Sequence, residues 1–414
     1  MHRTQRRGLG IIGLVVVAAM VSAACGTNKK ESSTNSGAAS SSSPTAKIAL
    51  IAPLSGDLSA LGLGMRNAVD LAVKQANDAG KVKGWKLEFD PEDDTAKADV
   101  GAQVASKVAS DSAMVGVVGT LNTSVALQVA PILQKASIVE ISPANTGIAL
   151  TGRDKIPNQV RVFDNYFRVA TTDDIQGPFA ADFVFDTLGK KKVAVVHDKK
   201  AYGQGLSEAF KGEFTKKGGT VLTTETINPG DKDFSAVISK IKPLAPELLY
   251  YGGEYPEASL LTSQMKAAGL NIPLMGGDGL VDKTYGKNAG PAAEGDFATN
   301  VGAPAEQLAS AKKFIDDYKA AGYKDDFSAY GAYAFDAANV IINAMAKVLP
   351  GKSKIDDTVR KDIIKAVQAT QLDGVTGKVS FDAFGDTTSK VLTVYKIKDA
   401  DFKPEKTADF GSGK

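Results

Sequence analysis

Residues 47–56 form the stretch KIALIAPLSG, in which an unbroken apolar run ends in a proline, a serine and a glycine. A short apolar run bounded by turn residues is typical of a strand buried on both faces. Residues 64–80 follow with apolar positions at helical spacing and end at Gly80, which predicts a helix that stops there. A buried strand followed by an amphipathic helix is the repeating unit of a parallel α/β sheet.

The same alternation continues along the chain. The next predicted strands are WKLEFD, MVGVVGT and SIVEIS, with helices near residues 96–110 and 124–135. After residue 166 the pattern starts again with YFRVAT, KKVAVVHD, TVLTTETI, ELLYYGG and IPLMGG, and with helices near residues 174–188, 205–217 and 257–268. The sequence therefore predicts the α/β class, with two parallel sheets that carry helices on both faces.

The C-terminal part adds a strand (FATNV), helices over 305–321, 330–349 and 359–369, the segment GKVSFD, and LTVYKIKD as the last strand. We expect a first lobe over residues 46–167 plus 297–385, a second over 168–296 plus 386–404, and a tail over 405–414. Because the chain crosses between the lobes more than once, a ligand cleft is expected where they meet.

The N-terminus predicts export. Arg3, Arg6 and Arg7 precede an apolar run that ends in small residues before Cys25, and a run this short favours a signal peptide over residues 1–25. Small residues directly before a cysteine resemble a bacterial lipoprotein signal, which implies a lipidated Cys25. Residues 26–45 are rich in Ser, Gly, Ala and Thr and predict a flexible tether.

Composition excludes several functions. Removal of the signal leaves 46 basic and 47 acidic residues, so no excess of positive charge points to nucleic acid. Cys25 is the only cysteine and His197 the only histidine of the mature chain, which disfavours a thiolate or histidine metal site. We expect no cofactor, no metal and a monomer.

Loops of similar chemistry follow the predicted strands. They are PLSGDLSALG, GTLNTSV, SPANTG, HDKKAYGQG, YYGGEYPE and MGGDGL, each composed mainly of glycine, hydroxyl and amide residues with a few acids and aromatics. Backbone N–H groups and hydroxyls at helix starts suit a carboxylate, and an aspartate at a neighbouring strand end suits an ammonium.

In this order and spacing, the loops resemble those of the periplasmic leucine/isoleucine/valine-binding proteins, the substrate-binding subunits of branched-chain amino acid ABC importers. The resemblance covers residues 46–400. It implies the type I periplasmic binding protein fold, with two Rossmann-like lobes that are joined by three crossovers and close on an amino acid like a hinged trap. It implies no enzymatic activity.

The resemblance also implies a ligand shell. Thr123, with Ser124 beside it, and Thr146 would bind the α-carboxylate, whereas the Ala144 carbonyl and the Asp278 carboxylate would bind the α-ammonium. Tyr202 would hydrogen-bond the ligand carboxylate from the second lobe. Asn145 has no assigned role.

Two positions depart from the family's pattern. Leu61 stands where an aromatic residue is frequent, and Glu254 replaces a tyrosine, with Tyr255 one place later. If Glu254 faces the cleft, a more cationic or polar ligand than leucine is favoured. If it faces the solvated rim, which we favour, Tyr255 supplies the ring.

Leucine, isoleucine and valine are therefore the first expected ligands, delivered to an ABC permease by an extracytoplasmic protein anchored to the cell membrane through Cys25. Another amino acid, a small amide or an anchored ligand sensor are the alternatives. A hydrolase is disfavoured, since His197 and Asp198 occur without a Gly-x-Ser-x-Gly elbow. Each of these residues could instead have a purely structural role. Thr123 or Thr146, for example, could cap a helix.

Overall fold

The computed structural model describes residues 43–410; the predicted signal peptide, Cys25 and most of the tether lie outside this range. The first sheet has the order β2-β1-β3-β4-β5, and all its neighbouring strands are parallel. Its strands are β1 (Thr45–Ala52), β2 (Lys86–Asp93), β3 (Met114–Gly119), β4 (Val139–Ser142) and β5 (Tyr166–Arg168).

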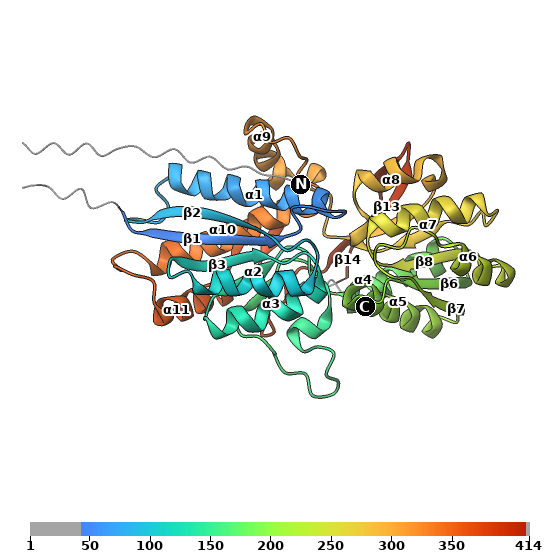
Figure 1. Ribbon diagram of the computed structural model, residues 1–414, viewed down its shortest axis with the longest axis horizontal. Helices are drawn as coiled ribbons and strands as arrows, with labels where there is room; N and C mark the ends of the chain where they lie inside the picture. Colours follow the sequence, from blue (N-terminus) through green and yellow to red (C-terminus); the bar gives the residue numbers. More distant parts are fainter. Residues whose placement is uncertain (1–42, 411–414) are drawn as a thin grey trace, which may run out of the picture. The chain divides into compact units, whose positions relative to one another are not determined.

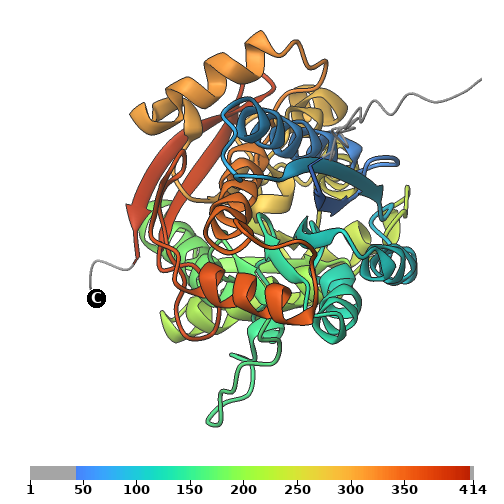
Figure 2. The same cartoon turned by 90° about the vertical axis from the view of Figure 1, so that its left-hand side faces the viewer.

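Helices cover both faces of this sheet. Figure 1 shows α1 (Ser59–Asp78) on one side, and α2 (Ala98–Ser110) and α3 (Thr123–Lys135) on the other. Figure 2 turns the view to show α10 (Gly331–Val348), which packs against α1, and α11 (Asp357–Gln368), which packs against α10.

The apolar run of β1 supplies both faces of the sheet, because successive side chains of a strand point in opposite directions. Ala49 and Ile51 join a core with Val125 and Val129 of α3. Ile48, with Leu50 and Ala52, belongs to the larger core on the other side. This explains why the strand is apolar throughout instead of alternating.

The second sheet has the order β14-β13-β10-β9-β8-β6-β7. Its strands are β6 (Lys192–His197), β7 (Thr220–Thr226), β8 (Leu248–Gly252), β9 (Leu274–Gly276), β10 (Phe297–Val301), β13 (Val391–Lys398) and β14 (Asp401–Asp409). Its helices are α4 (Asp173–Asp182), α5 (Ala201–Lys216), α6 (Ser235–Ile241), α7 (Tyr255–Ala267) and α8 (Lys283–Ala289). Figure 1 shows α4 and α5 on one side of this sheet and α7 and α8 on the other.

Shorter elements complete the described chain. They are the turns η1 (Ile148–Thr151), η2 (Phe183–Thr187), η3 (Lys242–Leu244), η4 (Asp278–Leu280), η5 (Gly290–Ala293), η6 (Ala305–Gln307) and η7 (Ala309–Ala311), the helix α9 (Lys312–Ala320), and the hairpin of β11 (Leu372–Gly374) and β12 (Gly377–Val379). The helix expected over 305–321 is thus two short turns followed by α9. No helix among residues 43–410 has the length and apolar character to cross a membrane.

The chain passes between the two sheets three times. The first crossing follows Arg168 at the end of β5, the second follows Val301 at the end of β10, and the third precedes Val391 at the start of β13. The loops next to these crossings lie where the two lobes meet, so residues that are far apart in the sequence come together there.

Three segments differ from the expected arrangement. Residues 166–168 begin the strand YFRVAT, which was expected to open the second sheet, but they pair parallel with β4 in the first sheet. Residues 297–301, expected in the first lobe, pair with β9 and β13 in the second sheet. Residues 405–409, expected in a tail, belong to β14, which pairs antiparallel with β13. The sequence DFKPEKTAD lacks an apolar alternation because β14 is an exposed edge strand, where lysine and proline are common.

Candidate functional site

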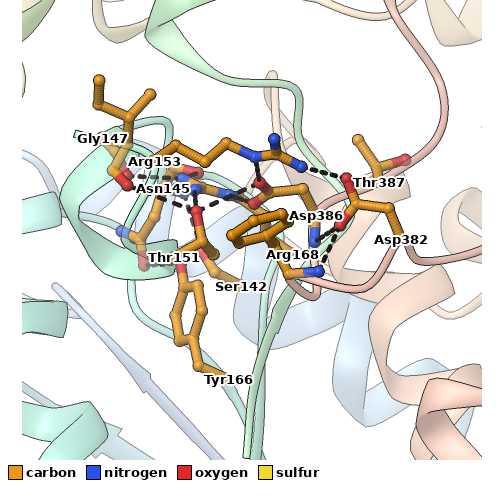
Figure 3. Close-up of polar contacts among 12 residues, drawn as sticks. Ser142, Asn145, Gly147, Thr151, Arg153, Tyr166, Arg168, Asp382, Asp386 and Thr387 are labelled. Carbon is orange, nitrogen blue, oxygen red and sulfur yellow. Dashed lines mark hydrogen bonds and ion pairs between the residues drawn. The ribbon is translucent and has the colours of Figure 1, made fainter. Parts of the chain in front are cut away.

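The loops that follow β3 and β4 meet at one edge of the first sheet, because neighbouring parallel strands end there. Asn145 joins them: its Nδ2 donates to the Leu121 carbonyl at 2.8 Å. Its Oδ1 accepts from the hydroxyl of Tyr166 at 3.1 Å, and both of these residues are drawn in Figure 3. The Gly147 N–H donates to Thr123 Oγ1 at 3.4 Å, and a Cβ on Gly147 would lie 2.4 Å from Thr123 Cγ2. Asn145 therefore fixes one loop against the other, and Gly147 permits their close approach.

A carboxylate that the sequence analysis did not single out lies beside Thr146. Asp173 starts α4, and its backbone N–H donates to the Thr146 carbonyl at 3.0 Å. Asp173 is 2% exposed, and the neighbouring Thr146 hydroxyl acts to lower the pKa of its carboxylate; among the described residues neither group has any other hydrogen-bond partner. Burial raises the pKa of Asp173 well above its usual range, and the Asp278 carboxylate adds to this rise. Buried polar atoms normally have partners, so a bound group that supplies hydrogen-bond donors would satisfy these oxygens.

Asp278 follows β9 and is held by tyrosines from both lobes. Tyr202 of α5 donates its hydroxyl to Oδ1 at 2.8 Å, and Tyr330, immediately before α10, donates to Oδ2 at 2.7 Å. Burial raises the pKa of Asp278, and these two hydrogen bonds oppose the rise. Each carboxylate oxygen has a second lone pair, so Asp278 can still accept hydrogen bonds from an ammonium.

Tyr202 lies where its predicted role requires, but its hydroxyl is already engaged. It donates to Asp278 and accepts from the Gly279 N–H at 3.1 Å. A tyrosine hydroxyl has a single hydrogen to donate. A contact with a ligand carboxylate therefore requires that this hydroxyl turn away from Asp278.

Glu254 does not lie on the solvated rim that the sequence analysis favoured. It is 3% exposed, it accepts from Lys200 Nζ at 2.7 Å, and it accepts from Asn122 Nδ2 of the first lobe at 2.6 Å. Burial of an acid is tolerated when a cation pairs with it, and Lys200 supplies that cation. Burial acts to lower the pKa of Lys200, but attraction to Glu254, with smaller contributions from Asp198 and Glu257, raises it above its usual range.

The structure gives the positions of the other predicted residues, Leu61, Ala144 and Ser124, but no contact that assigns them a role. Leu61 lies in α1 and is fully buried in the larger core, which also contains Tyr255. Ala144 is 4% exposed and its N–H donates to Ser142 Oγ at 3.1 Å. Ser124 is partly exposed on the first turn of α3.

Sequence reasoning missed Asp173, Tyr330, Asn122 and Lys200. Asp173 belongs to a Thr-Thr-Asp-Asp start of a helix, which is an ordinary first-turn pattern. Tyr330 is separated from Asp278 by 52 positions and joins it only through the second crossing. Asn122 and Lys200 lie inside the loops GTLNTSV and HDKKAYGQG, so their positions in these loops were the available signal.

Two cavities, of about 740 and 420 Å³, lie elsewhere in the molecule. Both are lined by Tyr333 and Thr376, and neither is lined by Thr146 or Asp278. The candidate site is therefore defined by buried polar groups that converge from the two sheets.

Comparisons with known proteins show which family of sequences the chain is similar to. A family model described as periplasmic binding protein matches residues 45–402. Leu/Ile/Val-binding protein homolog 3 of Brucella melitensis is 33% identical over 357 residues, which cover 85% of this chain and 91% of the relative. A leucine-, isoleucine-, valine-, threonine- and alanine-binding protein of Pseudomonas aeruginosa is 33% identical over 352 residues, which cover 85% and 90%.

Solved structures show the same likeness. The leucine-binding protein of Thermotoga maritima is 27% identical with a TM-score of 0.77, over 87% of this chain and 98% of that chain. A branched-chain amino acid transporter substrate-binding protein of Streptococcus pneumoniae, solved with isoleucine, is 26% identical with a TM-score of 0.76, over 88% and 99%.

Proposed function

Because the chain belongs to the periplasmic binding protein family, we propose that it captures a small amino acid between its two lobes and delivers it to an ABC permease. The chain has the type I fold of that family, and both the predicted family and the predicted fold class are confirmed. It is a binding protein and not an enzyme. Leucine, isoleucine and valine are the first candidate ligands, since relatives with those names match most of the chain.

The observation that carries this proposal is the buried Asp173 carboxylate near Asp278, which has no hydrogen-bond partner among the described residues other than the neighbouring Thr146 hydroxyl. An α-ammonium brings three N–H donors and one positive charge. The Asp173 carboxylate and the half-satisfied carboxylate of Asp278 would accept those donors, with the Ala144 carbonyl as a further acceptor. Since buried carboxylates need a cation, the ammonium is the group that this part of the site suits best.

The α-carboxylate would lie on the other side of the head group. Thr123 begins α3, a helix of 13 residues, and the side chain of its capping residue Asn122 makes no bond to the helix. The positive end of a helix favours an anion, and the Thr123 and Thr146 hydroxyls can donate to one. Tyr202 would complete this contact from the second lobe after its hydroxyl turns.

The ligand side chain would lie toward Leu61 and Tyr255. Glu254 is paired with Lys200, and burial and the Glu254 charge raise the pKa of the neighbouring Asp198 to about 8, so these three groups together add no net charge near pH 7. This pairing supports a neutral side chain over the cationic one that an unpaired Glu254 would have favoured. An aliphatic amino acid therefore remains the leading candidate.

Capture would proceed by lobe closure. Hydrogen bonds already join the lobes around the site, from Tyr330 to Asp278, from Asn122 to Glu254, from Tyr255 to the Asp57 carbonyl and from the Asp173 N–H to the Thr146 carbonyl. A ligand that shifts an open form from 1:99 to 99:1 closed must bind the closed form more tightly by about 5.5 kcal/mol. Contacts to the ammonium from both lobes would supply much of that difference.

The proposal includes a location. The family implies a protein that works outside the cytoplasm. A lipidated Cys25 would anchor the chain to the cell membrane, and the segment over residues 26–45 would let the lobes reach a permease. Lipid labelling of cells that express the full chain tests the anchor, with Cys25→Ala as the control that should lose the label.

A thermal-shift screen of residues 26–414 against the amino acids tests the function, since a ligand stabilises the folded protein by RT ln(1 + [L]/Kd). We expect stabilisation by at least one of leucine, isoleucine and valine. Asp278→Ala should weaken that binding by about 3 to 5 kcal/mol, because it removes one partner of a buried charge pair. Stabilisation by no amino acid would refute the proposed function.

A further inference from the structure

A fully buried arginine lies at the first crossing between the lobes. Arg168 ends β5, and its side chain is 0% exposed. Its Nε donates to Asp386 Oδ1 at 2.5 Å, and the Asp386 side chain is also 0% exposed. Asp386 lies shortly before β13, so this ion pair joins the first crossing to the third (Figure 3).

The same guanidinium holds the loop that follows β4. Its Nη1 donates to the carbonyl of Gly147 at 2.8 Å and to the carbonyl of Asn145 at 3.2 Å. These carbonyls flank Thr146, whose buried hydroxyl has no partner within residues 43–410 apart from the neighbouring Asp173 carboxylate. Nη2 donates to Thr151 Oγ1 at 2.7 Å, just beyond the loop. One rigid side chain therefore sets the backbone on both sides of Thr146.

A second arginine completes the charge balance. Arg153 pairs with both Asp386 and Asp382, so two guanidinium groups face two carboxylates. The Asp382 carboxylate also accepts from the backbone N–H groups of Phe384 at 2.9 Å and of Asp386 at 3.1 Å. The segment before β13 is thus fixed at several points, and Arg168 is anchored to a rigid partner.

Only arginine can make this set of contacts. A guanidinium presents five N–H donors in a planar fork, whereas a lysine presents a single point charge on a flexible stem. A lysine at position 168 could keep the pair with Asp386, but it could not also reach the carbonyls on both sides of Thr146.

We infer that Arg168 is a positioning residue for ligand capture, which acts by holding Thr146 in register with the first and third crossings. This inference rests on the proposed function, because Thr146 matters here as a contact of the ligand head group. Arg168 itself touches no ligand. Its effect on affinity should therefore pass through Thr146.

Arg168→Lys tests the inference by calorimetry, with leucine as the probe, or with the amino acid that stabilises the parent most in the screen above. We expect the affinity to fall by about tenfold or more, the typical effect of losing hydrogen bonds that involve a charged group. Arg360→Lys is the matched control. The Arg360 guanidinium also holds three carbonyls, those of Asp111, Ala136 and Met114, at the opposite end of the first sheet.

Arg360→Lys should lower the melting temperature but leave the affinity within about twofold of the parent, because loss of a distant contact is additive with binding. A double-mutant cycle adds a measurement that a purely structural role would not change. In a Thr146→Ala background, Arg168→Lys should cost much less affinity than in the parent, since the residue through which it acts is already altered.

Equal losses of affinity in both backgrounds, or parent-like affinity in Arg168→Lys, would overturn the inference while leaving the proposed function intact. If the parent binds no amino acid, the proposed function fails instead. If Arg168→Lys does not fold, the same double-mutant cycle can be measured with Thr151→Val, because this change removes one hydrogen-bond partner of the guanidinium and no charge.

Discussion

Tyr330 and Asp278 form a hydrogen bond of 2.7 Å between residues that belong to different lobes. Tyr330 precedes a helix of the first lobe, and Asp278 follows a strand of the second. The bond exists only when the loops of the two lobes meet, so it links the proposed ammonium contact to closure.

Tyr330→Phe should therefore weaken ligand binding. Loss of a hydrogen bond to a charged group costs about 1.5 to 3 kcal/mol, and calorimetry should show a corresponding rise in Kd. Tyr318→Phe is the matched control, because the Tyr318 hydroxyl donates to the Asp325 carbonyl within the first lobe. An equal loss of affinity in both variants would contradict the role given to Tyr330.

Asp173→Asn should stabilise the empty protein but weaken ligand binding. The pKa of Asp173 is raised by burial, so the folded protein keeps this proton after the unfolded chain has released it. The parent thus loses stability as pH rises above about 4, the unfolded value, toward the raised folded value. Denaturant unfolding should show the variant's gain at about pH 8 and no gain near pH 4.

Asp174→Asn is the control for that experiment, since Asp174 is the exposed neighbour on the same helix turn. A gain of similar size in Asp174→Asn, or a gain for Asp173→Asn that does not depend on pH, would contradict the account of Asp173.

Lys200→Met should destabilise the protein, because it leaves the buried Glu254 carboxylate without its cation. We expect a loss of about 2 to 3 kcal/mol, less than for a fully buried pair because solvent screens an exposed ammonium. The Lys200 side chain keeps 20% of its surface exposed. Adding Glu254→Gln should restore much of the loss in denaturant unfolding, and no recovery would show that the ion pair is not the cause.

Acid should lower the stability of the folded protein because it protonates Asp386. Burial acts to raise the pKa of Asp386, but Arg168 and Arg153 outweigh it and hold the pKa below its usual range. A depressed pKa gives stability that is present above the unfolded value of about 3.9 and is lost as pH falls through the folded value. Asp386→Asn should therefore cost about 3 to 5 kcal/mol near pH 7, and this cost should shrink below about pH 4.

Asp154→Asn is the control, because Asp154 is exposed on the same loop as Arg153. Unfolding curves of both variants at several pH values measure how the cost of Asp386→Asn depends on pH. A cost for Asp386→Asn that stays constant from neutral pH to acid would mean that the ion pair does not contribute through charge.

The sequence predicted the parts of the fold that depend on local pattern. Apolar runs such as residues 48–52 identified the buried strands, and turn residues located the loops that follow them. β14 was not predicted, because an exposed edge strand needs no apolar face. β10 was assigned to the wrong sheet, because the sequence of one strand does not show which strands it pairs with. Strand pairing depends on distant segments, which a local pattern does not encode.

The site residues show the same difference between what a local pattern predicts and what depends on distant segments. Thr123, Thr146, Tyr202 and Asp278 lie in loops that the sequence already marked. Asp173 looks like an ordinary helix start, and only the folded chain reveals that its carboxylate is buried without a cation to pair with among the described residues. The position of Glu254 was predicted wrongly because Lys200, the cation that allows its burial, is 54 positions away.

The most direct test of the central claim is a crystal structure of the chain with the amino acid that stabilises it most. The account predicts a ligand ammonium within hydrogen-bond distance of both Asp173 and Asp278, and a ligand carboxylate at the start of α3. A ligand bound in the 740 Å³ cavity beside Tyr333, with Asp173 left unpartnered, would contradict it.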